Sequence, residues 1–235
     1  MVKEHIPTDF LRADVQHSGT RHLVLATIEQ LKLLSKAKTW YVNEDATFKV
    51  VKQPFPQLFS VYAFVKKDGH FKQLPLAFIV MSLRRKKDYK CVLRALIAAL
   101  PKRPRVQSVV ADFEAAVWSA VRNVLPGVIQ RGCAFHFGQA VWRNVQSAGL
   151  QRLYTMDDHI NHVCLQMMAL PFLPAEVIAD QFRTLQTASD NPHVVQHLEY
   201  MERNWINSST WPPSAWSVFR QPVRTNSDVK AGTAV

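Results

Sequence analysis

Asp45 and Asp112 each follow a short apolar segment that predicts a buried strand, at residues 39–42 and 106–111. If these two strands are neighbours, the two carboxylates meet at one edge of a sheet. Carboxylate oxygens are hard ligands suited to Mg²⁺ or Mn²⁺. Two such ions about 4 Å apart can activate a water or a 3′-hydroxyl and stabilise the leaving oxygen of a phosphodiester. A third carboxylate normally completes the site.

Both aspartates also have a purely structural interpretation. Asn43, Glu44 and Asp45 form a polar run that suits an ordinary turn. Asp112 precedes a predicted helix, where aspartate is a common N-cap. The pattern alone leaves both interpretations open.

Cys133 and His136 have the spacing of half a zinc site, and His159 and His162, three apart on one predicted helix face, could supply the other half. Cys164 falls on the opposite, apolar face of that helix, so we expect it in the core. The alternatives are that Cys133 is a packed core cysteine, and that His136 is an auxiliary proton carrier near the metal edge.

Seven cations flank a predicted helix over residues 88–100: Arg84, Arg85, Lys86, Lys87, Lys102, Arg103 and Arg105. If both ends of this helix lie on one side of the sheet, the cations form a basic rim suited to DNA phosphates. The alternative is that they only solubilise two loops. The run Arg84 to Lys87 also fits a nuclear-import patch, which agrees with a nuclear location.

The elements that must position these residues alternate between strands and helices. Periodicity predicts strands at 39–42, 58–65, 74–82, 106–111 and 128–132, with a turn at Asp68 and Gly69 and helices after the third, fourth and fifth strands. Residues 47–51 could extend or pair with the first strand. Three antiparallel-capable strands followed by helix, strand, helix, strand and helix predict an α/β fold of the RNase H-like type, a mixed sheet flanked by helices.

The rest of the chain is predicted to be helical or extended. Residues 1–36 are expected as a helical lead-in with one helix over 21–35, and residues 37–150 as the sheet-containing core. An all-helical segment follows over 151–206, with Glu199 and Glu202 on the solvent face of its last helix. Residues 207–235, rich in Ser, Pro and Trp, are expected to be an extended tail that is truncated or diverged.

Composition agrees with a packed domain that binds polyanions. The 235 residues are 48% hydrophobic and 20% charged, with a formal net charge of +11. A strongly basic surface attracts nucleic acid first. Three cysteines do not make a disulfide framework, and the chain has no signal-peptide segment and no apolar run of about 18 residues. We therefore expect an intracellular protein that binds DNA and no membrane, with a homo-oligomer left open.

Several blocks of the sequence resemble the transposases of Mutator-like elements, the MULE family. Residues 40–49 (Trp-Tyr-Val-Asn-Glu-Asp-Ala-Thr-Phe-Lys) and 54–59 (Pro-Phe-Pro-Gln-Leu-Phe) resemble the block around the family's first aspartate. Residues 112–116 (Asp-Phe-Glu-Ala-Ala) resemble the second-aspartate block, and residues 132–139 the Cys-x-x-His segment. Residues 192–194, 200–205 and 216–219 resemble the family's downstream helical part.

The resemblance implies that Asp45 and Asp112 are the first two acids of a DDE triad, with Mg²⁺ or Mn²⁺ as cofactor and DNA strand cleavage and transfer as the activity. The family's third acid is a Glu after a Thr-Asn-Asn type segment. Here Thr225 and Asn226 are followed by Lys230 at the expected position, and the chain ends five residues later. A lysine would repel metal ions, and Asp228 is a poor substitute without a helix to position it.

The sequence therefore predicts a transposase-derived domain that is impaired in catalysis. No paired Cys/His finger precedes residue 40, so we also expect no separate DNA-reading module of that kind. The alternative is a non-catalytic, domesticated nuclear module that keeps the fold to bind DNA or protein. An active RNase H-type nuclease is a third interpretation, and it would also need the missing acid.

Overall fold

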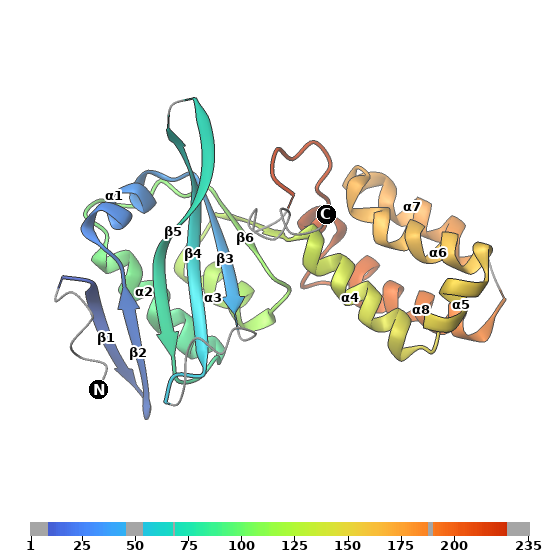
Figure 1. Cartoon of the computed structure of the whole chain (residues 1–235), viewed down its shortest axis with the longest axis horizontal. Helices are drawn as coiled ribbons and strands as arrows, with labels where there is room; N and C mark the ends of the chain where they lie inside the picture. The colour runs from blue at the N-terminus through green and yellow to red at the C-terminus, as the bar shows by residue number, and fades with distance from the viewer. Residues whose placement is uncertain (1–8, 46–53, 68, 188–189, 225–235) are drawn as a thin grey trace. The chain divides into compact units, whose positions relative to one another are not determined.

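The computed structural model describes residues 9–45, 54–67, 69–187 and 190–224, with the backbone only at 44, 45 and 67. By contacts, the chain divides into two compact units, which in the described part are residues 9–131 (unit 1) and 132–224 (unit 2). Unit 1 contains nearly all of the sheet, and unit 2 is helical (Figure 1).

The sheet of the described chain has seven strands in the order β1-β2-β5-β4-β3-β6-β7. Their bounds are Leu11–His17 (β1), Thr20–Leu25 (β2), Thr39–Asp45 (β3), Gln57–Lys67 (β4), His70–Met81 (β5), Ser108–Ala111 (β6) and Ile129–Gly132 (β7). β3 pairs antiparallel with β4 and β4 with β5, whereas β3 pairs parallel with β6. The α/β class with a mixed sheet flanked by helices is thus confirmed.

Three helices of unit 1 separate the strands in sequence: Ile28–Lys36 (α1), Lys86–Ala99 (α2) and Ala115–Val124 (α3). α2 and α3 pack against each other, and α2 also contacts β1 and β2. In β3, three consecutive residues, Trp40, Tyr41 and Val42, are all buried. Consecutive burial means that both faces of this central strand are covered.

The start of the chain differs from the expectation. The predicted helix over 21–35 is wrong in its first part, because Thr20–Leu25 is β2, paired with β1 and β5. The leucines that suggested a helix also fit a strand, and the pairing partners of β2 decide between the two. Helix α1 begins only after Thr27, whose side chain accepts from the Gln30 backbone N–H while Gln30 caps it in return.

Unit 2 contains the helices after β7: Ala134–Ser147 (α4), Gln151–Met156 (α5), Asp158–Ala169 (α6), Leu170–Phe172 (η1, 3₁₀), Ala175–Gln186 (α7), Pro192–Met201 (α8), Glu202–Ile206 (η2, a π-helical turn) and Pro213–Trp216 (α9). Its core includes an aromatic cluster in which Phe137 stacks on Trp216 and meets Trp205 edge to face. Trp216 is fully buried, so the stretch after Asn207 belongs to this core. Of the helices in the described chain, none is both long and apolar enough to span a membrane.

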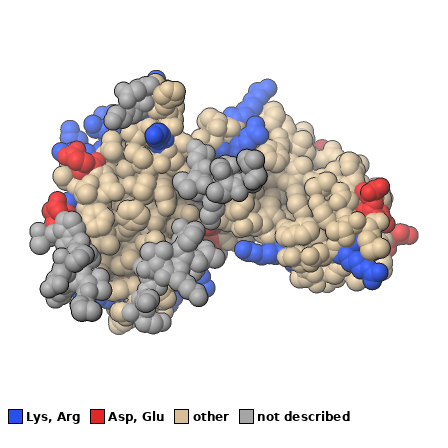
Figure 2. Space-filling model, in the orientation of Figure 1, with Lys and Arg blue, Asp and Glu red and all other residues tan. Residues whose placement is uncertain are grey.

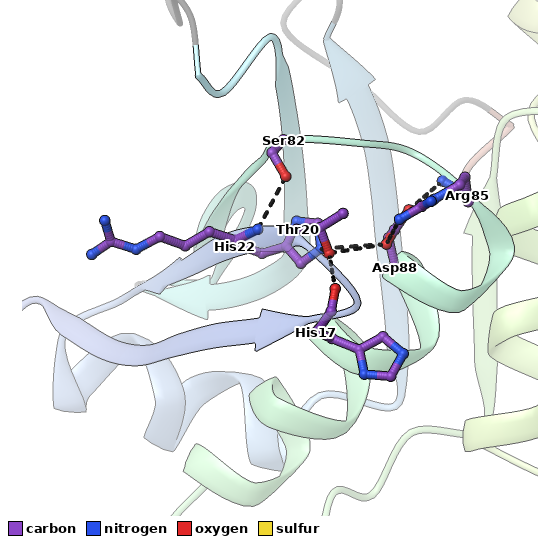
Figure 3. A network of polar contacts seen from close by, with 7 residues as sticks. His17, Thr20, His22, Ser82, Arg85 and Asp88 are labelled. Carbon is purple, nitrogen blue, oxygen red and sulfur yellow. Dashed lines mark hydrogen bonds and ion pairs between the residues drawn. The ribbon is translucent and has the colours of Figure 1, made fainter.

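A buried polar network fixes the beginning of α2 to β2 (Figure 3). His22 and Asp88 are both fully buried, with His22 Nε2 3.5 Å from Asp88 Oδ1. Thr20 Oγ1 lies 3.1 Å from His22 Nε2, and Asp88 Oδ2 accepts from the backbone N–H and Nε of Arg85 at 2.9 and 2.8 Å. Asp88 therefore satisfies a free backbone N–H at the start of α2 and also pairs with a cation.

The charges in this network are unequal. Burial alone would raise the pKa of Asp88, but hydrogen bonds from Arg85 outweigh it and hold that pKa below its usual value. Burial lowers the pKa of His22 despite the nearby Asp88 carboxylate. The ion pair is thus Asp88 with Arg85, and His22 is neutral at pH 7.

Replacing Asp88 should destabilise unit 1. Asp88→Ala leaves buried His22 and the start of α2 without their partner, so we expect the free energy of unfolding to fall by about 3 kcal/mol. Asp14→Ala, which breaks an exposed ion pair with Arg21, is the control and should have a much smaller effect. Urea unfolding at pH 7 measures both, and equal losses would contradict the role assigned to Asp88.

A second prediction concerns acid stability in unit 2. His197 is fully buried with Nδ1 2.5 Å from Asn144 Oδ1, and burial lowers its pKa to about 4. The unfolded chain, with a histidine pKa near 6.5, binds this proton first. Stability is therefore lost as pH falls below about 6.5, by about 2 kcal/mol at pH 5. Unfolding followed by tryptophan fluorescence should show this loss, and His197→Gln should reduce it, whereas His159→Gln at an exposed position should not.

Candidate active site

The parallel pairing of β3 and β6 sets the geometry of the candidate site. Tyr41 lies opposite Val110, so the same offset, continued, places Asp112 beside Asn43, two residues before Asp45. With strands about 4.8 Å apart and a rise of about 3.3 Å per residue, the Cα atoms of Asp45 and Asp112 are roughly 8 Å apart. Both residues lie at the carboxyl ends of their strands, and carboxylates at this spacing suit a shared divalent cation.

Asp112 is held by the turn between β6 and α3. Its side chain is half-buried, and its backbone carbonyl accepts a hydrogen bond of 2.7 Å from Trp118 Nε1. The Trp118 ring stacks on that of Phe113 with centroids 6.3 Å apart. Because Trp118 is 3% exposed, the turn that carries Asp112 is anchored in the core. The side chain of Asp45 lies outside the described part of the structure.

Tyr89 on α2 connects Asp112 electrostatically with the basic residues. It is fully buried and its ring meets Phe59 of β4 edge to face. Burial raises the pKa of Tyr89. The charge of Arg84 lowers this pKa, and the charge of Asp112 raises it. Both side chains therefore lie within electrostatic range of the same phenol.

Arg84, Arg85, Lys86 and Lys87, named here the basic turn, are all exposed. They follow β5, whose last residue Met81 pairs with Gln57 of β4. The next residue of β4, Leu58, pairs with Asp45 at the end of β3. The basic turn is therefore at the same edge of the sheet as the two aspartates. The amino end of α2, where backbone N–H groups attract anions, lies there too.

Lys102, Arg103 and Arg105 are exposed but lie at the opposite edge. They precede β6, which runs parallel to β3, whereas the basic turn follows the end of β5. α2 crosses between the two edges, a length of about 21 Å for its fourteen residues. The two ends of α2 thus lie at opposite edges of the sheet. The seven cations therefore form two separate clusters and not a single basic rim.

The structure does not assemble the zinc set considered from the sequence. Cys133 is fully buried at the start of α4, whereas His159 and His162 are exposed on α6. Across the described residues, no three His, Cys, Asp or Glu side chains are grouped closely enough to hold a metal ion. Cys164 is buried as expected, and burial raises its pKa to about 11. His136, half-buried on α4, belongs to unit 2, and its auxiliary role stays a prediction.

Other predicted residues can be placed in part. Glu199 is exposed as expected, and Glu202, half-buried, accepts from Gln186 Nε2 at 3.1 Å. Asp228 and Lys230 lie outside the described residues, as do 47–51 and Asp68. Tyr89, Trp118 and Glu114 were given no role from the sequence, and burial raises the pKa of Glu114 to about 6.

Comparison with known families agrees with this arrangement. Residues 41–140 match the model of the MULE transposase domain, a range that contains both aspartates, the basic turn and Cys133 with His136. No curated protein matches the chain. The match begins within β3 and ends within α4, so it covers the strands and helices that position Asp45 and Asp112. Residues 41–140 of this chain are therefore a MULE transposase domain.

Proposed function

We propose that this domain binds duplex DNA at the carboxyl edge of its sheet and is built for metal-dependent strand cleavage, with Asp45 and Asp112 as metal ligands. The observation that carries the proposal is the parallel pairing of β3 with β6, since it brings the ends of two distant segments to one edge beside the basic turn. Transposase domains in general act on DNA and depend on divalent metal ions, which agrees with this assignment.

The residues at this edge fit a divalent cation by the chemistry of their donors. Asp45 and Asp112 would hold Mg²⁺ or Mn²⁺ through carboxylate oxygens. Such an ion, when bound, supplies a water of lowered pKa and neutralises charge on the phosphodiester. Trp118 keeps the Asp112 turn in place through its 2.7 Å hydrogen bond, which limits the rearrangement needed for binding.

The basic turn would position the DNA backbone next to the carboxylates. Lys86 and Lys87 lie in the first turn of α2, where the helix dipole disfavours cations. Their placement is thus not explained by helix stability, and four exposed cations at the amino end of a helix suit phosphate. Asp88 offsets part of the unfavourable charge and, through Arg85, keeps the turn in one conformation.

The third acid decides between an enzyme and a binding module. By resemblance Lys230 occupies the position of the family's glutamate, which favours impaired cleavage. The same residue supports the second candidate function, a domesticated module that binds DNA without cutting it. Nuclear location, suggested by the basic turn, belongs to both candidates and stays a prediction.

A plasmid-nicking assay in Mn²⁺ tests the catalytic part of the proposal. We expect weak nicking by this chain, an increase of about tenfold in Lys230→Glu, and a loss of about two orders of magnitude when Asp112→Asn is added to Lys230→Glu. Asp180→Asn, at an exposed carboxylate on α7, is the control and should change nothing. Nicking that survives Asp112→Asn would refute the site, and no nicking in any form would favour the binding module.

Duplex binding tests the basic turn. Arg84, Lys86 and Lys87 are changed together to Ser, and Arg85 is kept because it pairs with Asp88. We expect weaker binding and a slope of log K against log salt that is smaller by roughly 2–3, since each phosphate contact contributes about 0.9. The control changes Lys90, Arg94 and Arg122 to Ser, which removes the same charge from α2 and α3. Equal effects in the two variants would show that only net charge matters.

A further inference from the structure

The second basic cluster lies at the end of the sheet remote from Asp45 and Asp112. Its loop packs on the start of β3: Lys38 O accepts from the backbone N–H groups of Gln107 and Ser108 at 2.7 and 3.1 Å, and Ser35 O accepts from that of Arg105 at 3.0 Å. Lys102, Arg103 and Arg105 are therefore next to the exposed Lys36 and Lys38.

The β4–β5 hairpin extends from the same end (Figure 1). Tyr41 of β3 pairs with Tyr62 of β4, so the same register, continued, places Lys38 beside Val65. Beyond this point β4 and β5 continue as a pair out to Lys67 and His70. After the last residue of β4 that the structure describes, Gly69 has φ +81°, a conformation that favours glycine. The pairing of β4 with β5 is irregular between Val61 and Tyr62, opposite Pro75, and such bulges bend a ribbon away from its sheet.

The outer hairpin has cations on both faces and an exposed aromatic ring. Lys66 lies opposite Phe71 in the register, with Nζ 5.8 Å from the ring centroid. Phe71 exposes 65% of its surface. Lys72 pairs with Val65, which places it on the other face of the ribbon. We name the amino-edge surface the group of exposed residues Lys36, Lys38, Lys66, Phe71, Lys72, Lys102, Arg103 and Arg105.

Acidic residues are nearly absent around this surface. The sequence has no Asp or Glu in 30–43, 57–67, 69–87 or 95–111, and Asp68 is the single acid of the hairpin. Figure 2 shows Lys and Arg side chains along this end of unit 1, with acidic side chains beside some of them. Because like charges repel one another, a cluster without acidic neighbours weakens the fold slightly and favours an anionic partner.

We propose that the amino-edge surface is a second contact for duplex DNA, in which the β4–β5 hairpin enters a groove. A two-stranded ribbon fits the major groove. Lysines on its two faces suit the phosphates on either side, and an exposed Phe suits a thymine methyl or a base step. The assignment of DNA rests on the proposed function of the domain. Leu58, which pairs with Asp45, lies about 27 Å from Lys66 along β4. This distance corresponds to about 8 base pairs of duplex DNA.

Fluorescence anisotropy with a labelled duplex of about 30 base pairs tests the proposal, since this length exceeds the span between the two contacts at about 3.4 Å per base pair. The full chain is used with Asp112→Asn so that no cleavage interferes. One variant changes Lys66 and Lys72 to Ser, and a second changes only Phe71→Ser. A variant with Lys90 and Arg94 changed to Ser, which removes the same two charges from α2, is the matched control. Thermal unfolding verifies that each variant is folded.

We expect the Lys66 and Lys72 variant to bind about tenfold more weakly, with a salt slope smaller by roughly 2. Phe71→Ser should weaken binding and leave the slope unchanged, because it removes no charge. Unchanged binding in both hairpin variants, with a loss in the basic-turn variant, would overturn this inference and leave the proposed function intact. Failure of the parent chain to bind any duplex would remove both. Binding of the parent to phosphatidylserine vesicles through Lys66 and Lys72, without an effect on duplex, would replace DNA by a membrane surface.

Discussion

The parallel pairing of β3 with β6 is the constraint on which the rest of unit 1 depends. Parallel neighbours cannot be joined by a tight turn, because the chain must return to the starting edge before the second strand begins. Here β4 and β5 bring the chain to the carboxyl edge, and α2 carries it back to the amino edge before Ser108. The pairing places Asp45 and Asp112 together, and the crossover it requires also decides where the flanking cations lie.

The position of α2 consequently matters more than that of a helix that only covers a sheet. Its first turn has two lysines, which the helix dipole disfavours, and its start is fixed by a buried carboxylate that bonds Arg85 and lies against His22. An ion pair whose carboxylate is fully buried is rarely the most stable choice at such a position. What this one provides is a fixed direction for the chain between Met81 and α2, which keeps the basic turn at the edge of the sheet where Asp112 lies.

Much of this arrangement follows from sequence, for identifiable reasons. The strands at 58–65 and 74–82 and the helix over 88–100 have strong periodicity, and Asp45 and Asp112 follow apolar segments whose ends are easily located. β2 was missed because the spacing of Leu23, Leu25 and Ile28 fits a helix as well as a strand. Only its pairing with the neighbouring β1 and with β5, which is distant in the chain, separates the two possibilities.

The remaining failures have the same physical origin. Sequence places Arg84 and Arg105 at the two ends of one helix but does not say which edge of the sheet each end reaches, because that depends on the directions of β5 and β6. It likewise does not show that His159 and His162 are exposed while Cys133 is buried at the start of α4. The residues of a candidate site can thus be chosen from local pattern, whereas their grouping depends on strand pairing.

Cations at opposite edges of one sheet can fix the direction in which a duplex is held, whereas a single cluster cannot. A single patch at the carboxyl edge would hold a phosphate backbone at any angle, because point-charge contacts carry little directional information. With the proposed second contact, about 27 Å away, the second binding event would be intramolecular, and its effective concentration would be set by the rigid sheet rather than by a flexible linker. Two anchored contacts then define a direction for the duplex. Direction is what the proposed cleavage site would need, since Asp45 and Asp112 would act on a phosphodiester only when it is presented in one orientation.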